Sequence, residues 1–189
     1  DLALTEPLLK ALDDVGYETP SPIQAQVIPF MLQGKDVLGQ AQTGTGKTAA
    51  FALPILSRID LNKKDPQVLV LAPTRELALQ IDEALRSLTG GLRLRSLVII
   101  GGASRFRQAE AMRRGADIVV GTPGRVCDLM STRELNLGAV RSFVLDEADR
   151  MLDLGFIKDI RRIVATLPVK RHSALFSATM PAEVAGLAS

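Results

Sequence analysis

A chain of 189 residues with 47% hydrophobic residues is long enough to bury the core of one domain without metals or disulfides. A single cysteine excludes a disulfide framework within the chain, and no apolar run approaches the roughly 20 residues that a membrane span needs. The net charge of +2 is not by itself a sign of nucleic-acid binding, and with no tryptophan and 4% aromatic residues any such binding should hold the backbone and not stack on bases. We therefore expect a cytoplasmic protein with no membrane partner.

Two capped segments near the start predict helices. A threonine cap and a closing glycine predict a helix over Thr5–Gly16, and a serine cap with proline at the first helical position predicts another over Ser21–Gly34. Later segments of helical period predict helices over Arg75–Leu88, preceded by Thr74, and over Phe156–Leu167.

Between the helical segments lie six short apolar runs that predict strands. Continuous runs of Val, Ile and Leu are typical of parallel strands covered on both faces. The chain therefore predicts an α/β fold, a mostly parallel central sheet with helices on both faces, whose ligands lie at the carboxyl ends of the strands. The predicted strands are Asp36–Gln40, Gln67–Ala72, Ser96–Ile100, Asp117–Val120, Ser142–Leu145 and Ser173–Phe176.

A glycine-rich loop follows the first predicted strand and opens a helix. Gly44 and Gly46 let backbone N–H groups turn inward, where they cradle phosphates together with the positive end of the helix. Lys47 would then bridge the β- and γ-phosphates of ATP, and the Thr48 hydroxyl would bind Mg²⁺. The strict pattern begins with glycine where this chain has Ala41, and the alternative is a plain turn before an amphipathic helix. The loop reads Ala41-Gln42-Thr43-Gly44-Thr45-Gly46-Lys47-Thr48.

The fifth predicted strand ends in a cluster of carboxylates, Asp146, Glu147 and Asp149. Such a cluster is costly unless a positive group neutralises it, and Mg²⁺ bound to ATP is the natural candidate. Asp146 would hold the metal, and Glu147 would orient or deprotonate the attacking water. The alternative is a helix N-terminus, where acidic residues are favoured without any ligand.

The lone cysteine and the lone histidine provide no ligand cluster for zinc. Cys127 lies in a predicted helix and should pack as a small hydrophobe. His172 stands between basic residues and a strand, and we expect a solvated loop residue.

Six motifs follow one another along the chain: Gln24, Ala41–Thr48, Pro73–Ala78, Thr122–Arg125, Asp146–Asp149 and Ser177–Thr179. With these motifs in this order, the chain resembles the first RecA-like domain of the DEAD-box RNA helicases. Asp149–Asp153 followed by Gly155-Phe156 looks most like the bacterial RhlE-like branch. The resemblance implies one RecA-like P-loop NTPase domain over residues 1–189, with residues 1–34 as the Q-motif region.

The resemblance assigns roles at the nucleotide. Tyr17 would stack on adenine, Gln24 would bond the edge of the base through its amide donor and its carbonyl acceptor, and Thr19 belongs to the same nucleotide-binding set. Asp149 joins that set, and Ser177 and Thr179 would bond Asp149 and couple hydrolysis to closure on RNA.

The resemblance also implies an RNA site made of turns that follow three strands. Strand-to-helix turns present free N–H groups and a positive dipole end to phosphates, which gives sequence-independent binding. Discrimination from DNA would rest on the 2′-hydroxyl. The implied RNA-binding residues are Pro73, Thr74, Arg75, Gly101, Gly102, Thr122, Pro123, Gly124 and Arg125.

The resulting hypothesis is the N-terminal ATPase domain of an ATP-dependent RNA helicase. Because the chain starts at Asp1 without methionine, we expect a segment of a longer protein, whose second RecA-like domain begins after Ser189 and supplies arginine fingers. The isolated domain should therefore bind adenine nucleotides but hydrolyse ATP weakly. Two alternatives stay open: a DNA-directed helicase with the same core, and a nucleotide-gated RNA clamp without processive unwinding.

Overall fold

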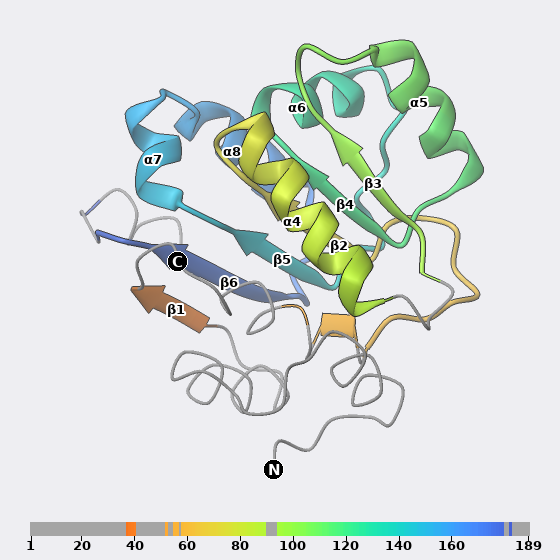
Figure 1. The fold of residues 1–189 in the computed structure, drawn as a ribbon, viewed down its shortest axis with the longest axis horizontal. Helices are drawn as coiled ribbons and strands as arrows, with labels where there is room; N and C mark the ends of the chain where they lie inside the picture. Colours follow the sequence, from red (N-terminus) through yellow and green to blue (C-terminus); the bar gives the residue numbers. More distant parts are fainter. Residues whose placement is uncertain are drawn as a thin grey trace.

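The structure, a computed structural model, describes residues 37–40, 52, 55, 56, 58–89, 94–179 and 182. Within them the strands form one six-stranded sheet in the order β1-β6-β5-β2-β4-β3 (Figure 1). Every strand pairing in this sheet is parallel, which confirms the predicted fold class. The helices predicted over Thr5–Gly16 and Ser21–Gly34 lie outside the described residues.

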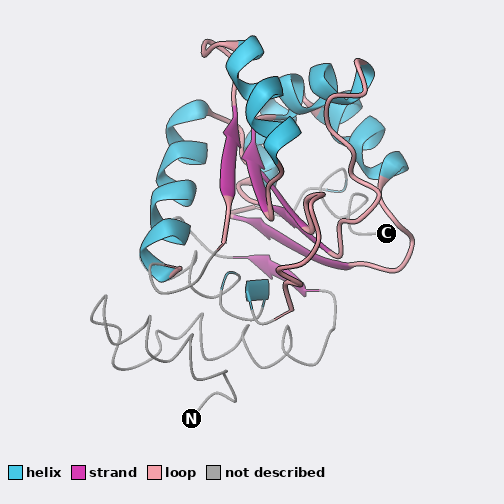
Figure 2. Ribbon diagram, turned by 90° about the vertical axis from the view of Figure 1, so that its right-hand side faces the viewer, coloured by secondary structure: helices cyan, strands magenta, loops and turns pink. Residues whose placement is uncertain are grey.

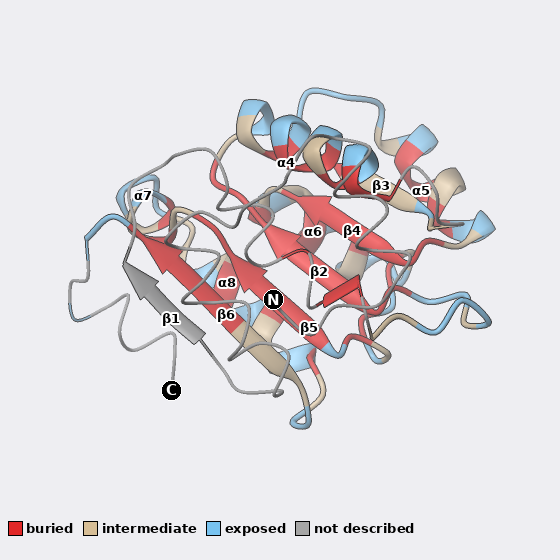
Figure 3. Ribbon diagram, turned by 60° about the horizontal axis from the view of Figure 1, so that its bottom comes forward, coloured by how far each residue is buried: buried red, intermediate tan, exposed pale blue. Residues whose placement is uncertain are grey.

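All six predicted strands are present, with ends that differ from the prediction by at most one residue. Residues of the central strands β2, β4 and β5 are all buried, as a strand covered on both faces requires (Figure 3). The strands are β1 (Val37–Gln40), β2 (Val68–Leu71), β3 (Ser96–Ile99), β4 (Ile118–Gly121), β5 (Ser142–Leu145) and β6 (His172–Ser177).

Helices cover both faces of the sheet (Figure 2). They are α4 (Arg75–Leu88), α5 (Arg105–Arg114), α6 (Pro123–Ser131), α7 (Ala148–Asp153) and α8 (Ile157–Thr166). Alternate residues of the strands feed two separate hydrophobic clusters. Val70 and the residues paired with it in β4 and β5 pack with the apolar side of α4. Leu69 and the residues paired with it in β4 and β5 pack with α5, α6, α7 and α8. Complete burial of an aliphatic side chain of this size contributes about 1.5–3 kcal/mol, so these two layers supply the core.

Helix α4 has the bounds that the sequence predicts. The Thr74 hydroxyl accepts a hydrogen bond from the Leu77 N–H at 3.2 Å, which satisfies one of the donors that a helix start leaves unpaired. At the other end, the Thr89 N–H donates to the Leu85 and Arg86 carbonyls. Helix α8 is one residue shorter at each end than the predicted Phe156–Leu167, because these two residues take the cap positions.

The prediction for His172 was wrong. This residue is half-buried and begins β6, where it pairs with Ser142 of β5, and its N–H donates to the Arg141 carbonyl at 2.7 Å. A flanking basic pair suggested a solvated loop, but the sheet ladder extends one residue further toward the N-terminus. The prediction for Cys127 is confirmed: its thiol is buried in α6, donates to the Asp159 carbonyl at 3.3 Å, and has a pKa that burial raises.

The register of the strands brings all six carboxyl ends to one edge of the sheet. Gln40 of β1 lies opposite Ser177 of β6, and Leu145 of β5 lies opposite Leu71 of β2. Leu71 also lies opposite Gly121 of β4, which in turn pairs with the last residue of β3. The loop after every strand therefore emerges at this edge, where parallel α/β sheets bind ligands.

Candidate functional site

The predicted site residues fall on two halves of this edge. The carboxyl ends of β1, β6 and β5 mark what we call the acidic half, which within the described residues holds Asp146, Glu147, Asp149, Ser177 and Thr179. The loops after β2, β4 and β3 form the glycine–arginine half, with Pro73–Arg75, Thr122–Arg125 and Gly101-Gly102. The two halves meet between β5 and β2, where the Asp146 N–H donates to the Leu71 carbonyl at 3.0 Å.

The remaining predicted nucleotide-binding residues, Tyr17, Thr19, Gln24 and the loop Ala41–Thr48, lie outside the described residues. Their predicted roles stay predictions. The structure does describe Gln40, the residue directly before this loop, and pairs it with Ser177 at the carboxyl edge. The predicted phosphate loop therefore follows, in sequence, a residue that lies at the acidic half of the edge.

Asp146 and Glu147 follow β5 directly and differ in environment. Asp146 is only 1% exposed, whereas Glu147 is half-buried. Glu147 has left-handed backbone angles, φ 53° and ψ 52°, which cost a residue with a β-carbon about 1–3 kcal/mol and cluster at functional sites. Its carboxylate makes no capping hydrogen bond to α7, although Glu147 occupies the N-cap position and Asp149 lies in the first turn, where acidic residues are favoured without any ligand.

Asp149 joins α7 to the end of β6. Its carboxylate accepts hydrogen bonds from the Thr179 N–H at 3.0 Å and the Thr179 hydroxyl at 2.9 Å, and its own N–H donates to the Ser177 hydroxyl at 3.1 Å. The contact that the resemblance implied between these three residues is thus confirmed. Burial raises the pKa of Asp149, but hydrogen bonds with Thr179, Ser177 and Arg150 outweigh it and hold the pKa below its ordinary value.

We expect Thr179→Val to raise the pKa of Asp149 toward its ordinary value, because the variant removes one donor to the carboxylate. Since the folded pKa is lowered, the stability that this group contributes is present at neutral pH and is lost as the pH falls through the folded pKa. An NMR titration of the Asp149 carboxyl carbon measures the shift, and Thr166→Val, which removes a hydroxyl bonded to the Ile163 carbonyl on α8, is the matched control. An identical Asp149 titration in wild type and Thr179→Val would contradict this assignment.

In the glycine–arginine half, the segments that follow β2 and β3 are in contact with each other. Arg75 is the exposed first residue of α4, and Gly102 lies in the loop after β3 with a positive φ of 78°. A β-carbon added at Gly102 would collide with the Arg75 guanidinium. The guanidinium therefore reaches from the loop after β2 to the loop after β3, although β4 lies between these strands.

Arg125 differs from the prediction in one respect. The sequence suggested a charge offered to RNA, but the side chain is only 16% exposed and binds the protein. It donates to the Ala103 carbonyl at 3.1 Å and to the Gln108 side-chain oxygen at 3.0 Å, while the Gln108 amide donates to the Ile100 carbonyl at 3.0 Å. Arg125 and Gln108 thus fix the shape of the Gly101-Gly102 loop.

Sequence reasoning missed Gln108. The signal for it was a glutamine beside Ala109 on the apolar side of α5, where a buried amide needs partners.

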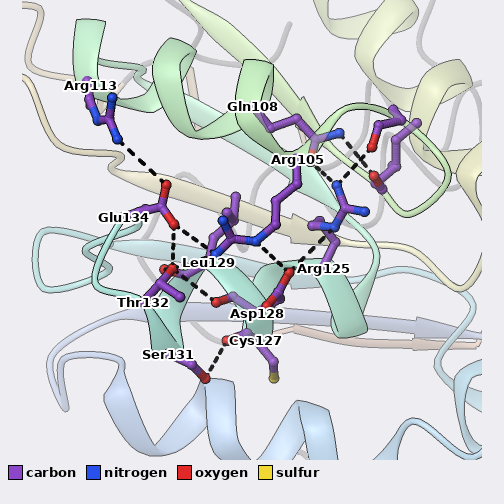
Figure 4. Close-up of polar contacts among 12 residues, drawn as sticks. Arg105, Gln108, Arg113, Arg125, Cys127, Asp128, Leu129, Ser131, Thr132 and Glu134 are labelled. Carbon is purple, nitrogen blue, oxygen red and sulfur yellow. Dashed lines mark hydrogen bonds and ion pairs between the residues drawn. The ribbon is translucent and has the colours of Figure 1, made fainter.

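A second polar cluster fastens α5 to α6 (Figure 4). Arg105 contacts Asp128 and Glu134 at 2.8 Å each and the Thr132 hydroxyl at 2.7 Å. The Asp128 and Glu134 carboxylates raise the pKa of Arg105, and the Thr132 hydroxyl and Arg105 lower that of Glu134. Asp128 also lies 3.9 Å from Arg125, so the cluster adjoins the residues that shape the glycine loop.

The described part of the chain contains neither a membrane-spanning helix nor a cluster of metal ligands. No helix there is long and apolar enough to cross a bilayer. No group of three or more His, Cys, Asp or Glu side chains there could hold a metal ion by itself.

Comparisons with known proteins agree with this geometry. A protein-family model described as DEAD/DEAH box helicase matches residues 21–187. A solved structure of a DEAD box protein from the hyperthermophile Methanococcus jannaschii superposes on the whole chain with a TM-score of 0.95 at 42% sequence identity, and the match covers 52% of that protein's chain.

Several curated bacterial proteins are similar in sequence. The ATP-dependent RNA helicase DeaD of Escherichia coli (strain K12) is 53% identical over 182 residues, which are 96% of this chain and 29% of that protein. The RNA helicase CrhR of Synechocystis is 50% identical over 184 residues, 97% of this chain and 37% of CrhR. This chain thus spans less than two fifths of the length of either relative. Neither carries the RhlE name, and that branch stays a prediction.

Proposed function

This chain belongs to the DEAD/DEAH box helicase family, and from that premise we propose that it is the N-terminal ATPase domain of an ATP-dependent RNA helicase. In the intact protein it binds ATP with Mg²⁺ and the backbone of single-stranded RNA, and it couples ATP hydrolysis to duplex unwinding together with a C-terminal RecA-like domain. The protein acts in the cytoplasm.

One observation carries this proposal. The acidic half and the glycine–arginine half occupy neighbouring strands of a single sheet edge, joined by the Asp146 to Leu71 hydrogen bond. A change at the acidic half therefore has a short, rigid connection to the RNA-binding turns. Such adjacency is what a motor needs if hydrolysis is to alter its grip on RNA.

In the acidic half, different residues have different roles in ATP binding and hydrolysis. Glu147 accepts the proton of the attacking water, and its carboxylate, which makes no capping hydrogen bond to α7, is available for this task. Asp149 is hydrogen-bonded to Ser177 and Thr179 at the end of β6. A movement of the segment that follows β5 would therefore also move the end of β6, the strand that pairs with β1. Lys47 and the N–H groups of Ala41–Thr48 cradle the phosphates.

The residues of this half fit a magnesium ion. Mg²⁺ prefers oxygen ligands and is commonly held by one or two carboxylates together with substrate phosphates. Asp146, a carboxylate at the carboxyl end of β5, and the Thr48 hydroxyl would hold it. Bound Mg²⁺ supplies positive charge that stabilises the transferring phosphoryl group.

Adenine recognition falls to the Q-motif region. Tyr17 stacks on the base, Gln24 bonds its edge, and Thr19 completes the set. A side-chain amide suits adenine because the base presents a donor next to an acceptor, which would favour ATP over GTP.

The glycine–arginine half binds RNA phosphates and sugars. The first N–H groups of α4 and α6 have no acceptor within their own helix and are directed at this edge. Exposed Gly124 and Gly101 have open space around them, which permits close approach of a strand. Arg75 supplies the charge, and Arg125 keeps the glycine loop in shape.

The experiment that tests the proposal is the ATPase rate of the intact protein with single-stranded RNA, with DNA of the same sequence and with neither. We expect RNA to stimulate turnover and DNA to have little effect. Equal stimulation by DNA, or none by RNA, would contradict the proposal. Duplex separation compared with RNA retention in a non-hydrolysable ATP analogue then distinguishes unwinding from clamping.

A further inference from the structure

Phe106 is an aromatic side chain in an unusual place. It is the second residue of α5, close to the Gly101-Gly102 loop, and it is 69% exposed. The other described phenylalanines belong to the core: Phe143 and Phe176 are buried, and Phe156 packs against the cluster beneath α8. We propose that Phe106 stacks on a base of the RNA strand bound along the glycine–arginine half, an inference that rests on the function proposed above.

The structure holds the first turn of α5 rigidly. Arg105, directly before Phe106, contacts Asp128 and Glu134 of the neighbouring segment at 2.8 Å. Gln108, two residues later, is buried and bonded to the Ile100 carbonyl. The Ser104 hydroxyl caps the helix by accepting from the Arg107 N–H at 3.3 Å. An aromatic ring on such a fixed turn loses little conformational entropy on binding.

The surroundings of Phe106 favour a nucleic acid over an apolar protein surface. Helix α5 carries four arginines against one carboxylate, Glu110. Arg107, exposed and next to Phe106, has no ion-pair partner in the part of the chain that the structure describes. Phe106 is also the only large apolar side chain exposed on α5. An exposed ring and an unpaired guanidinium on the same helical turn suit one base and a nearby phosphate.

This role modifies the expectation from composition. Few aromatic residues predicted binding through the backbone alone, and Phe106 adds a single stacking contact. Every base has a π-face, so such a contact raises affinity without sequence preference.

The test is the affinity of the intact protein for a single-stranded RNA oligomer and for the same ribose–phosphate chain with abasic residues. We expect Phe106→Ala to weaken binding of the base-bearing RNA about 5- to 150-fold and Phe106→Tyr to retain it, with no effect of either on the abasic chain. The salt dependence should be unchanged in Phe106→Ala and smaller in Arg107→Ala. Val169→Ala, which trims the 95% exposed valine of the α8–β6 loop, is the control for removing an exposed apolar side chain.

Normal RNA affinity of Phe106→Ala, or an equal loss on the abasic chain, would overturn the proposal while leaving the helicase assignment in place. Failure of the unmodified protein to bind RNA would overturn both. Loss of a protein partner by Phe106→Ala with RNA affinity intact would assign the ring to a protein interface and would also overturn stacking.

Discussion

Replacing Glu147 with glutamine is expected to lower ATP turnover of the intact protein by about 10²- to 10⁴-fold, the usual contribution of a general base. Glutamine has nearly the same shape but cannot accept the proton of the attacking water. ATP binding should persist, because the phosphate loop and Asp146 are unchanged. Single-turnover hydrolysis measures the first effect, and nucleotide titration measures the second.

Glu83→Gln is the matched control for this experiment. It makes the same substitution at an exposed residue of α4, away from the carboxyl edge, and should leave turnover unchanged. Turnover in Glu147→Gln close to that of the control would remove Glu147 from the mechanism. Loss of ATP binding together with turnover would assign it to binding.

Replacing Gly102 with alanine is expected to weaken RNA binding of the intact protein by about 10- to 150-fold, the loss of one charge-assisted hydrogen bond worth about 1.5–3 kcal/mol. The added methyl group would collide with the Arg75 guanidinium, the end of a flexible side chain, and we expect the guanidinium to leave its present position. A positive φ of 78° adds backbone strain that alanine tolerates poorly. RNA affinity measured by fluorescence anisotropy reports the loss.

Gly155→Ala separates the two effects. Gly155 has a similar positive φ of 84°, but a β-carbon there would meet nothing within 4 Å. The two variants should therefore lose similar stability from backbone strain, and only Gly102→Ala should lose RNA affinity. Equal RNA affinity in both would show that the position of Arg75 does not matter for binding.

The sequence predicted the central strands β2, β4 and β5 well because each is a short apolar run that the fold buries on both faces. Helix α4 was predicted to the residue because Thr74 and the apolar period of Ala78, Ile81 and Leu85 both mark it. The acidic half was predictable for a related reason: its residues directly follow two strands, and parallel strands end at one edge.

The rest depends on contacts between distant segments, which local patterns do not encode. Arg105 pairs with Asp128, 23 residues later, and Arg125 pairs with Gln108, 17 residues earlier. The position of β6 against both β1 and β5 is likewise a property of the sheet and not of any segment. The start of β6 at His172 and the contact between Arg75 and Gly102 both depend on the order of the strands in the sheet, so neither could be predicted from a single segment.

A crystal structure of the intact protein with Mg²⁺ and a non-hydrolysable ATP analogue would show whether one gap holds the triphosphate. We expect its phosphates between Lys47-Thr48 and the carboxylates of Asp146 and Glu147, at the ends of β1 and β5. A nucleotide bound elsewhere, or those two elements on separate surfaces, would contradict the assignment of this edge as an ATPase site.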